Sequence, residues 1–169
     1  AEINHVRDNS SHHEHANLTL LAKNQFGYKN LIKLISKSQI AGKLSGTPVI
    51  ETEWLAEHSN GLIALSGGFR GHIGKAVLDN NHDLFLKRIK YFQKIFEEDF
   101  ILEISRINRP QEDLYNEYIL SQAGELGLPV VASNEVRFID KEDYEAHETR
   151  VCIQKGEVLS DSRRTRNYF

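Results

Sequence analysis

Four short apolar runs, separated by segments of helical periodicity, constrain the fold of this 169-residue chain more than any other feature. The runs begin near residues 18, 62, 100 and 129, and each has the length of a buried strand. Between and after them the sequence predicts helices, at 25–37, 51–58, 72–78, 83–96, 110–125 and from residue 140 onward. Strands separated by helices favour parallel pairing with right-handed crossovers. The sequence therefore predicts an α/β protein with mostly parallel strands and flanking helices.

The last of these strands leads into the strongest candidate for a binding site. The segment 128–151 reads LPVVASNEVRFIDKEDYEAHETRV, a β-branched run that ends in polar residues. In open α/β folds, ligands bind at the carboxyl ends of the strands. Asp140, three residues before Asp143, then predicts the capped start of another helix. This strand–helix unit presents Glu135 and Arg137 where a ligand could bind.

Composition excludes several classes of protein. The chain has 21 basic and 24 acidic residues, a net charge of −3, which gives no case for a basic nucleic-acid-binding module. Its one cysteine, Cys152, cannot form an internal disulfide and suits a reducing, cytoplasmic environment. No segment has the length and hydrophobicity of a membrane span, so no membrane partner is expected. The chain contains no Met, and we expect it to be a piece of a longer protein.

Three further motifs each have a functional and a structural interpretation. The histidines of the N-terminal segment could bind zinc, but no Cys or helical spacing accompanies them, so an exposed loop or a tag remnant is favoured. The lysines at 29, 33 and 37 could contact phosphate, although a solvated helix face is favoured. The SGGFRG segment lacks the spacing of known phosphate-binding loops and indicates a tight turn. The histidines are His5, His12, His13 and His15.

Five sequence blocks occur in the order seen in one family. They are LTLLAKNQFGYKNLIKLISKS, GLIALSGGFRGHIGKAVL, FILEISRINRPQEDLY, GLPVVASNEVRFIDKEDYEAHETRVCI and LSDSRRTRNY. Together they resemble the N-terminal PHP (polymerase and histidinol phosphatase) domain of bacterial DNA polymerase III alpha subunits, over residues 17–169. The resemblance implies an incomplete, distorted (β/α)7 barrel that lacks its first strands. It divides the chain into a polar lead-in at 1–16, a C-terminal portion of the PHP domain at 17–155, and an extended tail at 156–169 that leads toward the absent polymerase core.

The resemblance also implies that the metal site of this family is degenerate here. Metal-binding relatives have His where this chain has Asn17, and Cys where it has Gly68. They have an Asp-x-His pair where it has Glu135 and Arg137. Arg stays protonated in proteins, so Arg137 places positive charge where a metal needs negative charge. No metal is therefore expected, although His15 could offer a displaced imidazole.

The function implied by the resemblance is that of a non-catalytic PHP scaffold in a DNA-directed DNA polymerase, a nucleotidyltransferase of DNA replication. No catalytic or cofactor-binding residue is expected in this fragment, and Mg²⁺ is implied only for the absent polymerase active site. The implied partners are the rest of the alpha subunit, the epsilon proofreading subunit and, through the full polymerase, DNA. The alternative is a metal-dependent phosphoesterase or exonuclease.

The spacing of Glu135 and Arg137 carries one further prediction. Residues two apart on an extended segment share a face, so a Glu135–Arg137 ion pair could take the place of the metal.

Overall fold

The computed structural model describes residues 2–7, 15–44 and 47–164, together with the side chains of 16–42 and 48–164. The chain divides into two units, which are described separately. The sheet unit comprises residues 1–106 and 110–133, and the α6 unit comprises residues 107–109 and 134–169. The predicted histidine motif and Arg166 fall on residues or side chains outside the described ones.

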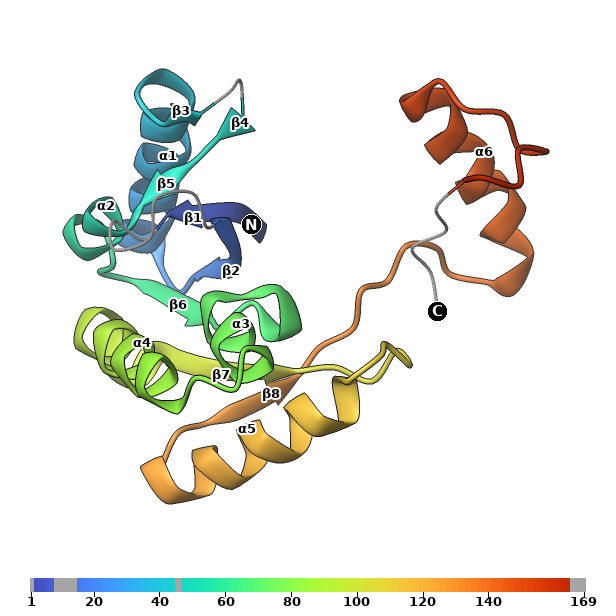
Figure 1. The fold of residues 1–169 in the computed structure, drawn as a ribbon. Helices are drawn as coiled ribbons and strands as arrows, with labels where there is room; N and C mark the ends of the chain where they lie inside the picture. Colours follow the sequence, from blue (N-terminus) through green and yellow to red (C-terminus); the bar gives the residue numbers. More distant parts are fainter. Residues whose placement is uncertain (1, 8–14, 45–46, 165–169) are drawn as a thin grey trace. The chain divides into compact units, whose positions relative to one another are not determined.

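The sheet unit is built on one mixed sheet with the strand order β5-β1-β2-β6-β7-β8 (Figure 1). Its strands are β1 (Glu2–Arg7), β2 (His15–Ala22), β5 (Ile50–Glu51), β6 (Leu62–Leu65), β7 (Phe100–Ile104) and β8 (Val130–Ala132). A separate two-stranded ribbon pairs β3 (Lys43–Leu44) with β4 (Thr47–Pro48). The helices are α1 (Gln25–Ile40), α2 (Thr52–Glu57), α3 (His72–Leu78), α4 (His82–Phe96) and α5 (Glu112–Leu126). Two short 3₁₀ turns, η1 (Gly68–Arg70) and η2 (Glu97–Asp99), complete the unit.

The four predicted strands are present as β2, β6, β7 and β8, and the predicted parallel pairing holds for β6, β7 and β8 but not for β2. β6 pairs in parallel with β7, and β7 with β8, whereas β2 pairs antiparallel with β6. The parallel rule applies to strand–helix–strand units. The segment between β2 and β6 contains the β3–β4 ribbon and β5 as well as two helices, so β2 and β6 do not form such a unit. β5 pairs in parallel with β1.

The polar N-terminal segment also differs from the expected lead-in, because it contains β1. β1 pairs antiparallel with β2, with an irregular register between Ile3 and Val6. Its sequence, EINHVR, lacks a continuous apolar run, which is why composition did not indicate a strand. The segment between the predicted helices 25–37 and 51–58 contains the end of α1 and the β3–β4 ribbon.

The core of the sheet unit follows directly from the alternation of apolar residues along the strands. Leu18 and Leu20 on β2 and Phe100 and Leu102 on β7 are fully buried, as period-2 patterning requires of one face of a sheet. Helix α4 contributes four buried apolar residues at helical spacing, namely Phe85, Ile89, Phe92 and Phe96. The ring of Phe92 stacks on that of Phe100 with centroids 5.4 Å apart. These contacts hold α4 against the sheet.

Asparagine caps fix where two helices begin. The Asn24 side chain accepts hydrogen bonds from the backbone N–H groups of Phe26 and Gly27 at the start of α1. Asn81 does the same for the N–H of Leu84 at the start of α4. Each cap satisfies N–H donors that have no partner within the helix.

The α6 unit consists of η3 (Lys141–Asp143), α6 (Tyr144–Lys155) and the segments around them. Asp140 and Asp143 form the predicted capping box at its start. The segment after α6, expected to be extended, instead forms two turns between residues 158 and 164. No helix within the described residues has the length and hydrophobicity needed to cross a membrane.

Candidate functional site

The turn after β6 contains two glycines whose backbone conformation and close contacts leave little freedom. Gly67 and Gly68 both adopt positive φ angles, of 78° and 54°, in the left-handed region that glycine tolerates best. A Cβ atom on Gly67 would lie 2.1 Å from the carbonyl oxygen of Asn17, so no side chain fits there. Asn17 also forms a parallel bridge with Gly71. This close approach brings two predicted site positions, Asn17 and Gly68, into the same region of the sheet unit.

Gly68 itself lies beside a carboxylate that the sequence did not single out as a ligand. A Cβ atom on Gly68 would lie 3.8 Å from the carbonyl oxygen of Glu103 and 3.9 Å from its Cγ atom. Those are ordinary van der Waals contact distances, so a Cβ atom would not clash here, although the positive φ of Gly68 disfavours any other residue. A side chain there would face Glu103, which lies on β7 near its carboxyl end.

Hydrogen bonds from neighbouring elements hold the Glu103 backbone in place. Its N–H donates to the Ser66 hydroxyl at 2.9 Å, and its carbonyl oxygen accepts from the Tyr115 hydroxyl at 2.8 Å. Burial raises the pKa of the Tyr115 hydroxyl, a hydrogen bond with Ser66 lowers it, and the charge of Glu103 raises it further. The net upward shift keeps Tyr115 protonated as a hydrogen-bond donor at neutral pH.

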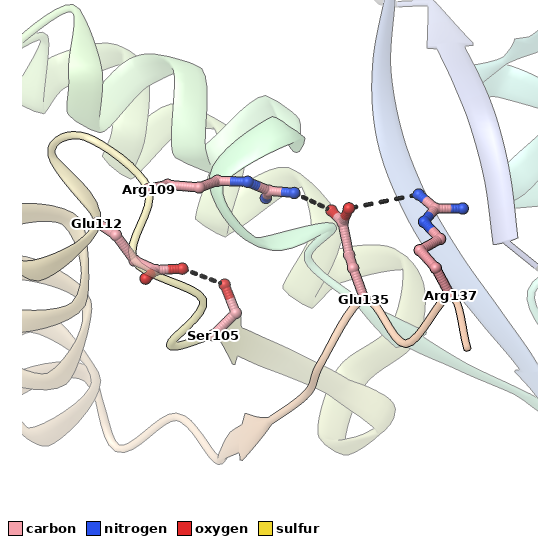
Figure 2. Close-up of polar contacts among 5 residues, drawn as sticks. All are labelled: Ser105, Arg109, Glu112, Glu135 and Arg137. Atoms are coloured by element: carbon pink, nitrogen blue, oxygen red, sulfur yellow. Dashed lines mark hydrogen bonds and ion pairs between the residues drawn. The ribbon is translucent and has the colours of Figure 1, made fainter. Parts of the chain in front are cut away.

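A second set of polar contacts fixes the chain after β7 (Figure 2). The Ser105 hydroxyl donates to the carboxylate of Glu112 at 2.8 Å, and the Asn116 side chain donates to the Ser105 carbonyl oxygen at 2.7 Å. Glu112 and Asn116 are both buried on α5. Because buried polar groups are costly without partners, this arrangement specifies the position of α5 against the end of β7. Its role is structural.

The α6 unit holds the other two predicted site residues, Glu135 and Arg137, and brings them together (Figure 2). Arg137 Nη2 lies 3.4 Å from Glu135 Oε2, so the predicted ion pair is present. The other carboxylate oxygen, Oε1, lies 2.6 Å from Nη2 of Arg109, a partner that the sequence did not reveal. Arg109 is 8% exposed, against 48% for Arg137, so the buried contact is the stronger of the two. Glu135 is therefore held between two guanidinium groups.

This arrangement does not fit a metal ion in the way the resemblance describes for metal-binding relatives. Both Glu135 oxygens face guanidinium groups, which repel a cation. Gly68 offers no side chain, and the Asn17 amide is a neutral group in place of an imidazole. Among the described residues, no group of three or more His, Cys, Asp or Glu side chains is placed to hold a metal.

Sequence reasoning found some of these residues and missed others for identifiable reasons. Glu135 and Arg137 are two apart, so their pairing could be anticipated from spacing. Arg109 lies in the chain after β7, and Glu103 acquires its position beside Gly68 only when β6 and β7 pair. The one local sign that Arg109 could belong to a site is its position among polar residues, INRPQE, just after a predicted strand.

Several known proteins are similar in sequence to this chain along about nine-tenths of its length. The model of the PHP domain family matches residues 1–107. The DNA polymerase III subunit alpha of Vibrio cholerae is 48% identical over 151 residues, which cover 89% of this chain and 13% of the relative. The corresponding subunit of Escherichia coli strain K12 is 43% identical over 155 residues, which cover 92% of this chain and 13% of the relative. The DNA polymerase III subunit alpha of Pseudomonas fluorescens is 44% identical over 151 residues, which cover 89% of this chain and 13% of the relative.

The chain therefore belongs to the PHP domain family. Within that family, it is similar along about nine-tenths of its length to alpha subunits of DNA polymerase III. It spans 13% of the length of these curated relatives.

Proposed function

We propose that this chain is the PHP part of a replicative DNA polymerase III alpha subunit and serves there as a structural scaffold. The observation that carries the proposal is the identity of 43–48% to such subunits over about nine-tenths of the chain. The mixed sheet with helices is consistent with part of a distorted (β/α)7 barrel, which is the complete fold we propose for the domain. We place the protein in the cytoplasm, where DNA replication occurs in bacteria.

The polymerase chemistry belongs, in this proposal, to the remainder of the subunit. Nucleotidyl transfer requires Mg²⁺ ions held by acidic side chains at the transferring phosphate. The described residues hold no cluster of three acidic, His or Cys side chains that could supply such a site. The fragment alone is accordingly expected to extend no primer, and DNA would be contacted through the full polymerase.

The scaffold role rests on how the strand ends are occupied. The Ser66–Glu103–Tyr115 and Ser105–Glu112–Asn116 contacts use polar groups to fix backbone positions. The Arg109–Glu135–Arg137 network uses a carboxylate to hold two cations instead of a metal. All three arrangements fix backbone positions through contacts within the chain, which suits a supporting role for the polymerase core and a docking role for the epsilon proofreading subunit.

Metal analysis tests the degenerate site directly. The purified chain is incubated with zinc, manganese or iron and dialysed, and the metal content is measured by elemental analysis. The expected result is less than one metal per chain, with no change in the Glu135→Gln variant. One or more metals per chain, lost on changing Glu135 to Gln, would contradict the proposal.

The alternative function is a metal-dependent phosphoesterase or exonuclease. One observation favours it, since the acidic side chain of Glu103 lies beside Gly68, one of the ligand positions of metal-binding relatives. An assay for phosphate release from a nucleotide or from single-stranded DNA, with and without manganese, separates the two. Manganese-dependent release that disappears in the Glu103→Gln variant would favour the enzyme over the scaffold.

A direct binding experiment tests the partner role. The chain is mixed with the proofreading subunit of the same source and analysed by size-exclusion chromatography. Co-elution supports docking by this domain. Separate elution of two folded proteins would assign the docking surface elsewhere in the alpha subunit.

A further inference from the structure

A pocket on the sheet unit, away from the strand-end residues described above, has no part in the proposed scaffold role. Its volume is about 290 Å³, and its walls come from α2, α3 and α4. The lining residues are Thr52, His72, Lys87, Arg88, Lys90, Tyr91, Phe92 and Lys94. Within the described residues, this lining combines aromatic rings with four cations and contains no carboxylate.

The lysines of the pocket lie close to one another in sequence on α4 and have no acidic partner among the described residues. Lys87, Lys90 and Lys94 recur at spacings of three and four along α4, so they lie on one face of the helix. Like charges at these spacings destabilise a helix slightly. In the described part of the chain none of the three makes an ion pair, whereas Lys23 pairs with Asp99 and Lys37 with Glu57. An anion bound at the pocket would relieve this repulsion.

The floor and walls of the pocket are preformed. Arg88 is 6% exposed, and its guanidinium donates a hydrogen bond to the His72 carbonyl oxygen at 2.6 Å. The Phe92 ring stacks on Phe100 in the core, and the partly exposed Tyr91 ring packs edge-on against Phe92. A ligand would therefore meet both aromatic rings held by core packing and the ammonium groups of the lining lysines. Binding to such a preformed surface costs little ordering entropy.

We propose that this α4 pocket binds a mononucleotide-sized ligand, with a planar aromatic group against Tyr91 and Phe92 and phosphate at the lysines. Small-molecule pockets span roughly 300–1,000 Å³, so the volume suits one compact ligand. Each ammonium group offers three donors to phosphate oxygens, and every base has a face that can stack on an aromatic ring. A surface that combines an apolar wall with several cations favours a ligand that has both a planar aromatic group and a phosphate.

Calorimetric titration of the chain with deoxyadenosine monophosphate tests the pocket, with adenosine and pyrophosphate as partial ligands. The nucleotide is expected to bind saturably at one site. Adenosine should bind at least about tenfold more weakly, because it lacks the phosphate and a charge-assisted hydrogen bond contributes about one decade in affinity. Pyrophosphate should also bind at least about tenfold more weakly, because it lacks the base that stacks on the aromatic wall. No saturable binding of the nucleotide at millimolar concentration would overturn the proposal. Pyrophosphate binding as tightly as the nucleotide would also overturn it, because the aromatic wall would then contribute nothing.

Matched variants locate the site. Changing both Lys90 and Lys94 to Gln is expected to weaken nucleotide binding roughly a hundredfold, about one decade for each charge-assisted hydrogen bond removed. The control changes Lys29 and Lys33 to Gln, an equally spaced pair on α1, and is expected to leave binding unchanged. Equal losses in both variants would show nonspecific attraction and overturn the assignment. Thermal midpoints close to that of the parent confirm that each variant is folded.

The aromatic wall has its own readout. Changing Tyr91 to Ala is expected to weaken nucleotide binding by about tenfold and to leave pyrophosphate binding unchanged, because stacking acts only on the base. Tyr28→Ala on α1 serves as the control for removal of an exposed tyrosine. A single-stranded oligonucleotide that displaces the nucleotide and binds far more tightly would instead assign the surface to a DNA strand, and would overturn the small-ligand proposal.

Discussion

The sheet unit and the α6 unit are stabilised by different kinds of contact. The buried positions of the sheet unit are mainly apolar and form one continuous cluster of strands and helices. In the α6 unit the buried residues are His147, Glu148 and Cys152. Several of its apolar residues are instead exposed, namely Val136, Ile139, Ile153 and Val158. Burial of apolar surface is the dominant stabilising term in small domains, so the sheet unit resists unfolding through its core.

The consequence is that the α6 unit depends on charge. Its ordered contacts are the Arg109–Glu135–Arg137 network, the Glu148–Arg164 pair and a ring cluster in which Phe138 contacts Tyr144 and His147. Ionic contacts near a surface weaken as salt increases, whereas apolar packing does not. We therefore expect salt and charge substitutions to act mainly on the α6 unit, and cavity-forming substitutions to act mainly on the sheet unit.

The largest expected effect is in the apolar core. Phe100 is fully buried on β7 and stacks on Phe92, so Phe100→Ala is expected to lower the free energy of unfolding by about 3–5 kcal/mol. The control is Phe26→Ala, since Phe26 is 71% exposed on α1 and should change stability by less than about 1 kcal/mol. Denaturant midpoints measure both. Similar midpoints for the two variants would contradict the position of the core.

The next effect concerns the buried ion pair of the α6 unit. Arg164 Nη2 lies 2.8 Å from Glu148 Oε2, and its Nη1 donates to Cys152 Sγ at 2.9 Å. The two charged side chains are 5% and 3% exposed. Glu148→Gln preserves size but leaves the arginine charge buried without its counter-charge, which is strongly unfavourable. We expect faster amide hydrogen exchange in α6 and a higher rate of Cys152 modification by a thiol reagent.

Glu145→Gln is the matched control for this prediction, because Glu145 is an exposed acid in the first turn of the same helix. It should leave the Cys152 reaction rate close to that of the parent. If both variants raise the Cys152 reaction rate equally, the general loss of negative charge from α6 would be the cause. The prediction that the Glu148–Arg164 pair protects the thiol would then be wrong.

The Glu135 network gives a smaller, graded effect. Because Arg109 is buried and Arg137 is half-exposed, a double-mutant cycle of Glu135→Gln with Arg109→Gln should give a coupling energy of about 1–3 kcal/mol. The cycle with Arg137→Gln should give about 0–1 kcal/mol, as for other exposed pairs. Denaturant midpoints provide the energies, and high salt should reduce the second coupling more. Equal couplings, or strict additivity in both cycles, would refute the idea that Glu135 is held between two unequal cations.

The same contrast explains how far the sequence could predict this molecule. Apolar periodicity located β2, β6, β7 and β8 and the buried face of α4, because burial is encoded locally in every strand and helix. Local patterns did not reveal β1, whose residues are largely polar, or the antiparallel pairing of β2 with β6. Spacing predicted the Glu135–Arg137 pair, but the contact of Arg109 with Glu135 in the α6 unit, and that of Glu103 with Gly68 in the sheet unit, form only through long-range folding. Charged contacts between distant segments leave no periodic signal, so the α6 unit was the harder part to predict.

The smallest expected effect is a pH dependence at the end of the described chain. Hydrogen bonds from the Arg163 side chain, and then from its backbone N–H, lower the pKa of the Asp161 carboxyl below its usual value of 3.8, while burial opposes the shift and Arg164 adds to it. A carboxyl with a lowered pKa in the folded state stabilises that state above the unfolded pKa, and this contribution disappears as the pH falls through the folded pKa. The loss is therefore confined to pH values below about 4.

Carboxyl carbon shifts in an NMR titration measure this pKa. In Arg163→Gln the pKa of Asp161 should rise toward 3.8, because the charged donor is lost. The control is Arg150→Gln on α6, since Arg150 has no contact with Asp161 and should leave its titration unchanged. Arg163 is largely exposed, so high salt should shift the parent pKa in the same direction as the Arg163 variant. A parent titration that coincides with that of Arg163→Gln at low salt would mean that this turn is not held by charge, and the dependence of the α6 unit on charge would then be limited to the Arg109–Glu135–Arg137 network and the Glu148–Arg164 pair.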